Sequence, residues 1–298
     1  ATSAPVALDV SVVAQADAPT LDVDAATGNE DTAIALDIDP AAAAEDINGE
    51  VTSVTISDIP EGAVLTLPGG ITFTASEGNT SVDLTPAQLE GLSITPPENS
   101  DEDFNLTITA TAQETDPDTG EVTTATSDPV SLPVTVDAVA DEADLNVADA
   151  TGAEDTAIPL EIGAVLTDAG EVLSVTVSGL PAGAVLSAGM DNGDGSWSLS
   201  GADLVGLTLT PPANMSGELA LQVRATSTDG TSTASTEGAL TVSVSPVADA
   251  PQLSVADAAG AEDTAIPLTI SSELTDTDGS ETLSLTISGV PEGATLSA

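Results

Sequence analysis

Carboxylates are the side chains in this sequence whose number and spacing suggest chemistry. The chain has 298 residues, with 50 aspartates and glutamates against one basic residue, Arg224, and it contains no cysteine and no histidine. Disulfides, thiolate and imidazole metal ligands and histidine-based catalysis are therefore excluded. Clustered carboxylates repel one another, and a hard cation such as Ca²⁺, which prefers oxygen ligands, is their natural small partner.

The acids recur at a junction that occurs three times along the sequence. Each junction has an Ala-Asp linker and then a Glu-Asp-Thr-Ala-Ile segment, as expected for a repeated module boundary. Further acids lie in a turn after a long alternating segment and in an Asp-rich loop. The candidate metal ligands are Asp17, Asp141 and Asp249 in the linkers; Glu30, Asp31, Glu154, Asp155, Glu262 and Asp263 in the Glu-Asp pairs; Asp116, Asp118 and Asp229 in the turn; and Asp276 and Asp278 in the loop.

Each of these acids can also be explained without a bound metal ion. Asp and Gly form turns by themselves, and a salty environment would screen the charge as well. We favour Ca²⁺ over solvated turns at the junctions, because the linker and the late turn can lie at the same pole of a module. The Asp-rich loop reads Asp276–Glu281, Asp168–Glu171 and Asp46–Glu50 in successive copies. No helical pattern flanks it, which excludes an EF-hand, and a turn and a local Ca²⁺ site both stay open there.

Hydrophobic residues alternate with polar ones along most of the chain. The core must be built from Val, Leu, Ile and Ala, because aromatic residues make up only 1% of the sequence. Alternation predicts antiparallel strands with one buried face. Short strands separated by Gly, Pro, Asp and Asn turns predict an all-β fold of tandem antiparallel, immunoglobulin-like β-sandwich modules in a linear array. The predicted parts are the last strand of a preceding module (1–15), repeat 1 (16–139), repeat 2 (140–247) and the N-terminal part of repeat 3 (248–298).

A few local features refine this prediction. Thr85, followed by Pro86 and Gln88, predicts a single capped helical turn, and Ser200–Leu204 is its counterpart. Pro133 inside a strand pattern predicts an edge or a bulge. Asp191–Gly195 predicts a hairpin turn.

Charge and hydropathy exclude several function classes. A formal charge of −49 excludes binding to nucleic acid and to anionic membrane surfaces. No apolar run is long enough to predict membrane insertion of this segment, and residue 1 does not begin a signal peptide. The repeat pattern starts and stops inside modules, so we expect the chain to be a piece of a longer protein.

Several stretches resemble the tandem extender repeats of large bacterial RTX adhesins. They are Asp276–Glu281 with Ile287–Ala294, Asn192–Trp197 and Thr210–Asn214, and the order of Ala225–Gly230, a final strand and Val247–Pro251 is similar to cadherin repeats. The resemblance implies type I secretion to the bacterial cell surface and a stalk stiffened by Ca²⁺ at module boundaries. It also implies that other parts of the full protein bind the host or surface ligand. The glycine-rich RTX nonapeptides do not occur in this sequence.

We therefore expect a non-enzymatic extender of a secreted surface adhesin, with calcium ions and neighbouring modules of the same chain as its partners. One alternative is a subunit of a self-assembling extracellular filament or surface layer. Another is a sandwich that binds a sugar or a protein directly. A glycoside-hydrolysing carboxylate pair is the remaining alternative, but no pair stands apart from the repeating acids.

Overall fold

The computed structural model describes residues 2–10, 12–43 and 50–297, which form an all-β protein with two short 3₁₀ turns. Its contacts divide it into two compact units. The first comprises Ala1–Val139 with Asp229–Ser232, and the second comprises Ala140–Thr228 with Thr233–Ala298. The described part of the chain has no helix long and apolar enough to cross a membrane. The predicted fold class, tandem β-sandwiches, is confirmed.

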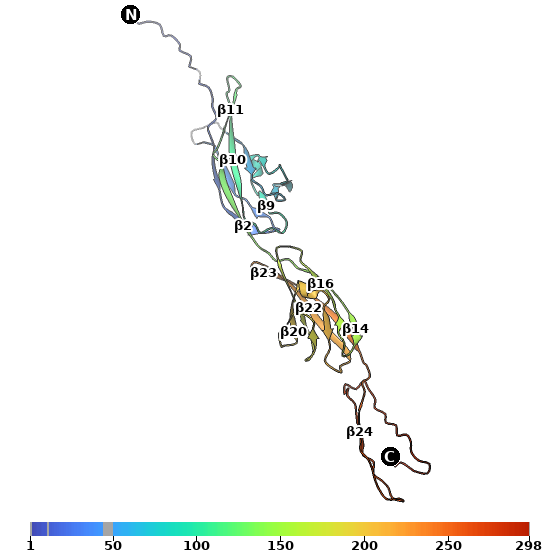
Figure 1. Ribbon diagram of the computed structural model, residues 1–298. Coiled ribbons are helices and arrows are strands. Elements are labelled where there is room, and N and C mark those ends of the chain that lie inside the picture. Colours follow the sequence, from blue (N-terminus) through green and yellow to red (C-terminus); the bar gives the residue numbers. More distant parts are fainter. Residues whose placement is uncertain (1, 11, 44–49, 298) are drawn as a thin grey trace. The chain divides into compact units, whose positions relative to one another are not determined.

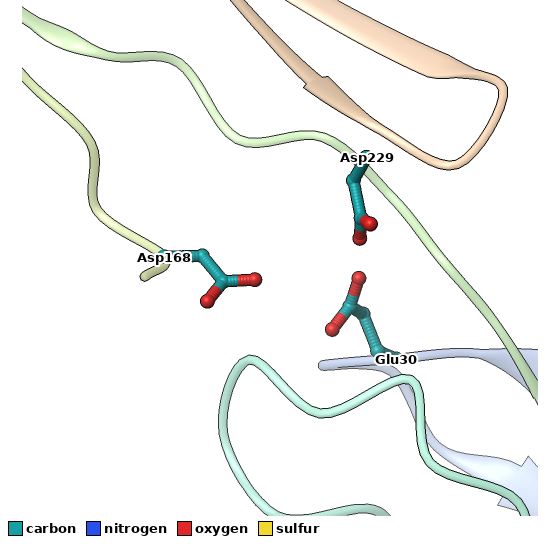
Figure 2. A group of neighbouring side chains, drawn as sticks. All are labelled: Glu30, Asp168 and Asp229. Atoms are coloured by element: carbon teal, nitrogen blue, oxygen red, sulfur yellow. The ribbon is translucent and has the colours of Figure 1, made fainter. Parts of the chain in front are cut away.

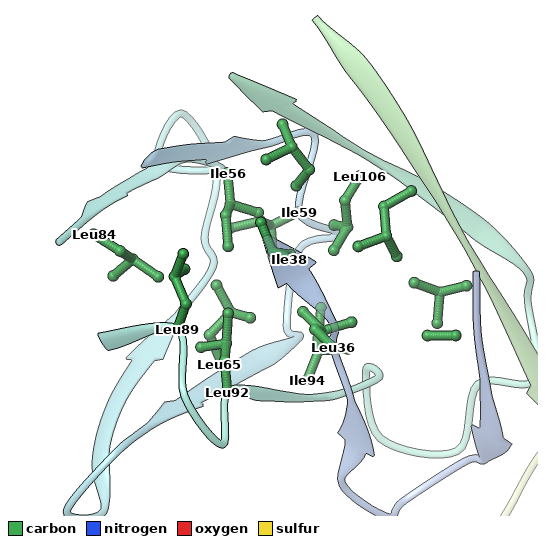
Figure 3. Close-up of a cluster of buried hydrophobic side chains, with 14 of the residues drawn as sticks. Leu36, Ile38, Ile56, Ile59, Leu65, Leu84, Leu89, Leu92, Ile94 and Leu106 are labelled. Atoms are coloured by element: carbon green, nitrogen blue, oxygen red, sulfur yellow. The ribbon is translucent and has the colours of Figure 1, made fainter. Parts of the chain in front are cut away.

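The first sandwich consists of two main sheets around one hydrophobic cluster (Figures 1 and 3). One sheet has the order β2-β12-β10-β5-β8, with β11 also on β10; the other has the order β3-β9-β6-β7, and β1 pairs with β4 separately. The strands are β1 (Thr20–Val23), β2 (Ala26–Asn29), β3 (Ile34–Ala35), β4 (Ile38–Ala41), β5 (Glu50–Ser57), β6 (Val64–Leu67), β7 (Ile71–Thr74), β8 (Val82–Leu84), β9 (Ser93–Thr95), β10 (Phe104–Thr115), β11 (Val122–Thr126) and β12 (Val130–Asp137).

The second sandwich repeats this plan around its own cluster. Its sheets have the orders β14-β23-β22-β17-β20-β19 and β15-β21-β18, with β13 paired to β16. The strands are β13 (Asp144–Ala148), β14 (Ala150–Ala153), β15 (Ile158–Pro159), β16 (Glu161–Val165), β17 (Val172–Ser178), β18 (Val185–Leu186), β19 (Met190–Asp191), β20 (Ser196–Ser200), β21 (Thr208–Thr210), β22 (Gly217–Asp229) and β23 (Ser232–Ser245).

The strand that enters each sandwich determines where the acids lie. In both sandwiches the chain first pairs antiparallel, as β1 with β4 or β13 with β16, and then crosses to the other sheet. There β2 runs parallel to β12, and β14 runs parallel to β23. Because parallel partners end at the same edge, the residue after β2 or β14 lies beside the end of the last strand. That residue is Glu30 in the first sandwich and Glu154 in the second.

The local predictions hold where the structure tests them. The 3₁₀ turns are Pro86–Gln88 (η1) and Gly201–Leu204 (η2), each with the predicted capping box. Pro133 precedes the residues of β12 that pair with β2, so it occupies an edge position. The Asp191–Gly195 segment connects β19 to β20 in a hairpin.

Two segments with the alternating pattern do not form strands. Residues 2–10 and 12–19 have no regular structure, and Val6, Leu8, Val10 and Val12 are exposed. Among the described residues of the third module only β24 (Gln252–Val255) and β25 (Ile270–Glu273) pair, and the alternating segment from Leu283 to Ile287 is unpaired. The equivalent strand in the second sandwich, β17, is held between β20 and β22, and no counterparts of those two strands lie among the described residues of the third module.

A glycine in the entering strand allows close packing in each module. A Cβ on Gly152 would lie 2.5 Å from Cγ1 of Ile158, a core residue that is only 1% exposed. Gly28 has the same relation to Ile34, at 2.7 Å. The approach of β14 to this isoleucine therefore requires a residue without a side chain.

We predict that Gly152→Ala destabilises the second sandwich by about 1–3 kcal/mol, because Ile158 cannot move within a packed core. Gly163→Ala is the matched control, since the nearest heavy atom to its new Cβ would be 4.0 Å away. Chemical denaturation of the full chain measures both variants. Equal stability of the two variants would show that the close approach is not a constraint.

Candidate metal centre

Glu154 holds the linker that follows the second sandwich. Its backbone N–H donates to the carbonyl of Ser245 at the end of β23 (3.0 Å), and its Oε1 accepts the N–H of Val247. The side chain is only 2% exposed. Its other oxygen, Oε2, is buried without a hydrogen-bond partner in the protein. A buried carboxylate oxygen that lacks a partner is costly unless a cation or another donor reaches it.

A second glutamate binds the same linker. Oε1 of Glu281 accepts the N–H of Asp249, two residues beyond Val247, and Oε2 of Glu281 is also buried without a partner. Glu171 accepts the N–H of Asp141 in the same way. The Val247–Asp249 linker is thus bound by one carboxylate before it in the chain and one after it.

Two aspartates join Glu154 to form a group that can hold a metal ion. One carboxylate oxygen from each of Glu154, Asp276 and Asp278 lies within 4.8 Å of the others. Asp276 is 1% exposed. Its Oδ1 accepts the N–H of Asp278 (2.8 Å), and its Oδ2 accepts the hydroxyl of Ser280 (2.9 Å).

Asp278 is oriented by donors on both of its oxygens. Oδ2 accepts the hydroxyl and the N–H of Ser216, at 2.6 and 2.9 Å, and Oδ1 accepts the N–H of Ser280 at 2.7 Å. The hydrogen bonds from Ser216 and Ser280 hold the pKa of Asp278 well below its usual range. The carboxylate therefore stays ionised, as a metal ligand must.

The first unit contains a related pair, Glu30 and Asp229, whose carboxylates point toward each other (Figure 2). The N–H of Glu30 donates to Asp137 (3.1 Å), its Oε1 accepts the N–H of Val139 (2.7 Å), and its Oε2 is buried without a partner. Burial raises the pKa of Glu30, and the adjacent Asp229 carboxylate raises it further. Asp168, drawn in the same figure, belongs to the other unit, where its Oδ1 accepts the N–H of Gly170 (2.8 Å).

The donor set fits a hard divalent cation. All the candidate ligands are carboxylate oxygens, and Ca²⁺ takes six to eight oxygens at about 2.3–2.6 Å. Ligands on opposite sides of one Ca²⁺ are then roughly 4.6–5.2 Å apart, which agrees with the spacing of the Glu154 group. A cation there would give the buried Oε2 of Glu154 a partner and offset the repulsion among the three carboxylates.

The second acid of each Glu-Asp pair shapes a turn. Asp31, Asp155 and Asp263 have φ values of 53°, 56° and 58°, a left-handed conformation that Asp tolerates better than most residues. Asp155 Oδ1 accepts the N–H of Asn214 (3.0 Å), and Asp31 Oδ1 accepts that of Asn99 (2.9 Å). Asp31 and Asp155 therefore each hold a neighbouring loop in place.

Asp116 binds backbone N–H groups. It is buried, and it accepts the N–H groups of Thr119 (2.7 Å), Asp118 (2.9 Å) and Ala14 (3.1 Å). The hydrogen bonds from Thr119 and Ala14 lower the pKa of Asp116 to about 2. Asp116 thus fixes its own turn and the segment that precedes the first sandwich.

The structure does not bring the remaining predicted ligands into either acidic group. Asp17, Asp118, Glu262 and Asp263 are exposed, and Asp141 and Asp249 contribute backbone N–H donors. Asp46 lies outside the described residues. The sequence analysis did not predict that Glu171 and Glu281 bind the linkers. The signal that could have identified them is that each is the glutamate at the end of an Asp-rich loop.

No protein-family model and no curated protein matches this chain. The solved structures to which this chain is similar include three of tandem domains. Drosophila N-cadherin EC1–4 is 12% identical over 77% of this chain and 50% of that one, with a TM-score of 0.33. Titin domains Z1Z2 in complex with telethonin are 10% identical over 78% and 100%, with a TM-score of 0.28. Chicken CNTN1 FN1–FN3 is 11% identical over 78% and 71%, with a TM-score of 0.29.

The chain thus spans half of the N-cadherin fragment.

We predict that Asp116→Asn lowers the melting temperature of the first sandwich by a few degrees at pH 7. A carboxylate whose pKa is lowered in the folded state stabilises the fold in full at pH values above its ordinary pKa of 3.8. This contribution is lost as the pH falls through the folded-state pKa of about 2. The difference between variant and parent should therefore shrink between pH 4 and pH 2. Asp118→Asn, which removes an exposed acid two residues away, is the control. A difference that is constant with pH would contradict the assignment.

Proposed function

We propose that the chain is a structural extender of a secreted bacterial surface adhesin, stiffened by Ca²⁺ where one module meets the next. The observation that carries the calcium part is Oε2 of Glu154, which is buried without a partner beside Asp276 and Asp278. With one basic residue in 298, the sequence cannot neutralise these carboxylates by ion pairs. Buried like charges need a counter-charge, and a divalent cation supplies it.

The sequence repeat extends the proposal to the first unit. Glu30 occupies the same place after β2 that Glu154 occupies after β14, and its Oε2 is also buried without a partner. Asp229 lies beside it and raises its pKa further. A cation bound to this pair would remove the same repulsion.

The aromatic residues favour a spacer over a module that binds sugars. Sugar sites present aromatic rings as platforms, and the sequence has only Phe73, Phe104 and Trp197. Phe73 and Phe104 pack against the first core, and Trp197 packs against the second. These rings therefore stabilise the sandwiches and form no platform for a sugar. In the proposed function, which is non-enzymatic, other parts of the full protein bind the ligand at the bacterial surface.

The calcium site is tested by Glu154→Gln. Glutamine keeps the oxygen that accepts the N–H of Val247 but replaces Oε2 with an NH₂ group, which cannot bind a cation. Saturating Ca²⁺ at about 100 times its Kd should stabilise the parent by about 2.7 kcal/mol. The variant should gain much less, and it should be at least as stable as the parent in a chelator. Thermal melts with Ca²⁺ titrated at constant ionic strength measure both effects.

Glu161→Gln is the matched control, since it removes an exposed carboxylate from β16 of the same sandwich. It should respond to Ca²⁺ like the parent. A stabilisation that Na⁺ or Mg²⁺ reproduces at equal ionic strength, or that Glu154→Gln retains in full, would leave only a screened acidic surface.

The filament or surface-layer alternative predicts self-association. A spacer should sediment as a monomer in both Ca²⁺ and chelator, whereas a filament subunit should form larger species in Ca²⁺. Analytical ultracentrifugation of the full chain separates the two functions.

A further inference from the structure

A loop of the second sandwich donates hydrogen bonds to the Asp-rich loop of the third module. Ser216 donates its hydroxyl and its N–H to Oδ2 of Asp278, at 2.6 and 2.9 Å. Nearby, Nδ2 of Asn214 donates to the carbonyl of Thr275, at 3.0 Å. The two contacts bind both the start and the middle of the Asp-rich loop.

The loop that carries Asn214 and Ser216 is itself fixed to the second sandwich. Asn214 has a φ of 54°, and its N–H donates to Asp155, the residue after Glu154. Met215, between the two donors, packs against the second core. The donors are therefore presented from a rigid base, so that little entropy is lost when they bind the next module.

The equivalent loop of the first sandwich has the same turn but different chemistry. Asn99 also has a φ of 54° and donates its N–H to Asp31 (2.9 Å), so Asn99 corresponds to Asn214. Two residues later, where the second sandwich has Ser216, the first has Asp101. An aspartate there has no hydroxyl to donate and would repel a carboxylate at the position of Asp278.

The Asp-rich loops differ at the position that receives these donors. In the third module, Asp276 accepts the N–H of Asp278 two residues later, and in the second module Asp168 accepts the N–H of Gly170 in the same way. Gly170 therefore corresponds to Asp278, and it carries no carboxylate. A loop with glycine at this position could not receive a serine hydroxyl.

We propose that Ser216 is a specificity-determining residue that selects the module which follows the second sandwich. Its partner is a module with aspartate at the second acidic position of its Asp-rich loop, as in Asp276-Thr277-Asp278. A sandwich with aspartate in place of Ser216, as the first one has, disfavours such a neighbour. The contact concerns the same junction as the metal site but does not require the ion.

The test measures hydrogen exchange of the full chain by mass spectrometry in a chelator. The readout is the exchange of peptides covering residues 246–251 and 275–281, which include the linker and the Asp-rich loop. Ser216→Asp removes the hydroxyl donor and places a carboxylate against Asp278. We expect these peptides to exchange about tenfold faster than in the parent, because a hydrogen bond to a charged group is replaced by repulsion.

Two further variants define the pairing. The double variant Ser216→Asp with Asp278→Ser swaps the two side chains, so that the hydroxyl lies on the third module and the carboxylate on the second sandwich. Its hydrogen exchange should return to within about threefold of the parent's. Asp101→Ser introduces serine at the equivalent position of the first sandwich and should leave both peptides unchanged. Protection of the β17 peptide confirms that each variant is folded, and Ser216→Ala replaces Ser216→Asp if that protection is lost.

Unchanged exchange in the Ser216 variant, or a double variant that exchanges as fast as Ser216→Asp, overturns the proposal. Glu154→Gln separates it from the calcium site. That variant should exchange no faster than the parent in chelator, because it removes a repelling charge, while it loses the response to Ca²⁺. The two proposals therefore fail in different measurements.

Discussion

The repulsion among buried carboxylates is the constraint on which the module ends depend. Glu154 and Asp276 are 2% and 1% exposed, and their oxygens lie in one group with Asp278. Backbone and hydroxyl donors reach part of this group, but they leave Oε2 of Glu154 without a partner. Burying like charges in this way is unfavourable unless a counter-charge is present. The sequence cannot supply one, so the arrangement makes sense as a binding site for a cation.

The sandwich topology delivers the acids to this place. The glutamate follows a short strand that runs parallel to the last strand, and the parallel pairing aligns its N–H with the carbonyl that ends β23. That pairing depends on core packing, since Gly152 lets β14 approach Ile158. The position of a charged side chain at the module end is thus determined by apolar contacts inside the module.

The sequence predicted what depends on local pattern. Alternation predicted the strands of the two complete sandwiches, and Thr85 with Gln88 predicted η1, because capping involves neighbours in the chain. It did not predict which acids become buried. Glu281 binds a backbone N–H 32 residues away, and Asp116 reaches Ala14, 102 residues away. The unpaired segment from Leu283 to Ile287 shows the other limit, because alternation specifies a strand only where partner strands are present.

The contacts at the end of the second sandwich separate into two kinds, with different consequences when the ion is removed. Glu154 and Glu281 bind the linker N–H groups through Oε1, and Ser216 binds Asp278, and none of these hydrogen bonds requires a cation. The carboxylates of Glu154, Asp276 and Asp278 are the contacts that the proposed cation would serve. The second core consists of apolar side chains, so its packing does not depend on these carboxylates. In the proposed function, removal of the cation loosens the junction through repulsion, while the hydrogen bonds to the linker and the second core remain.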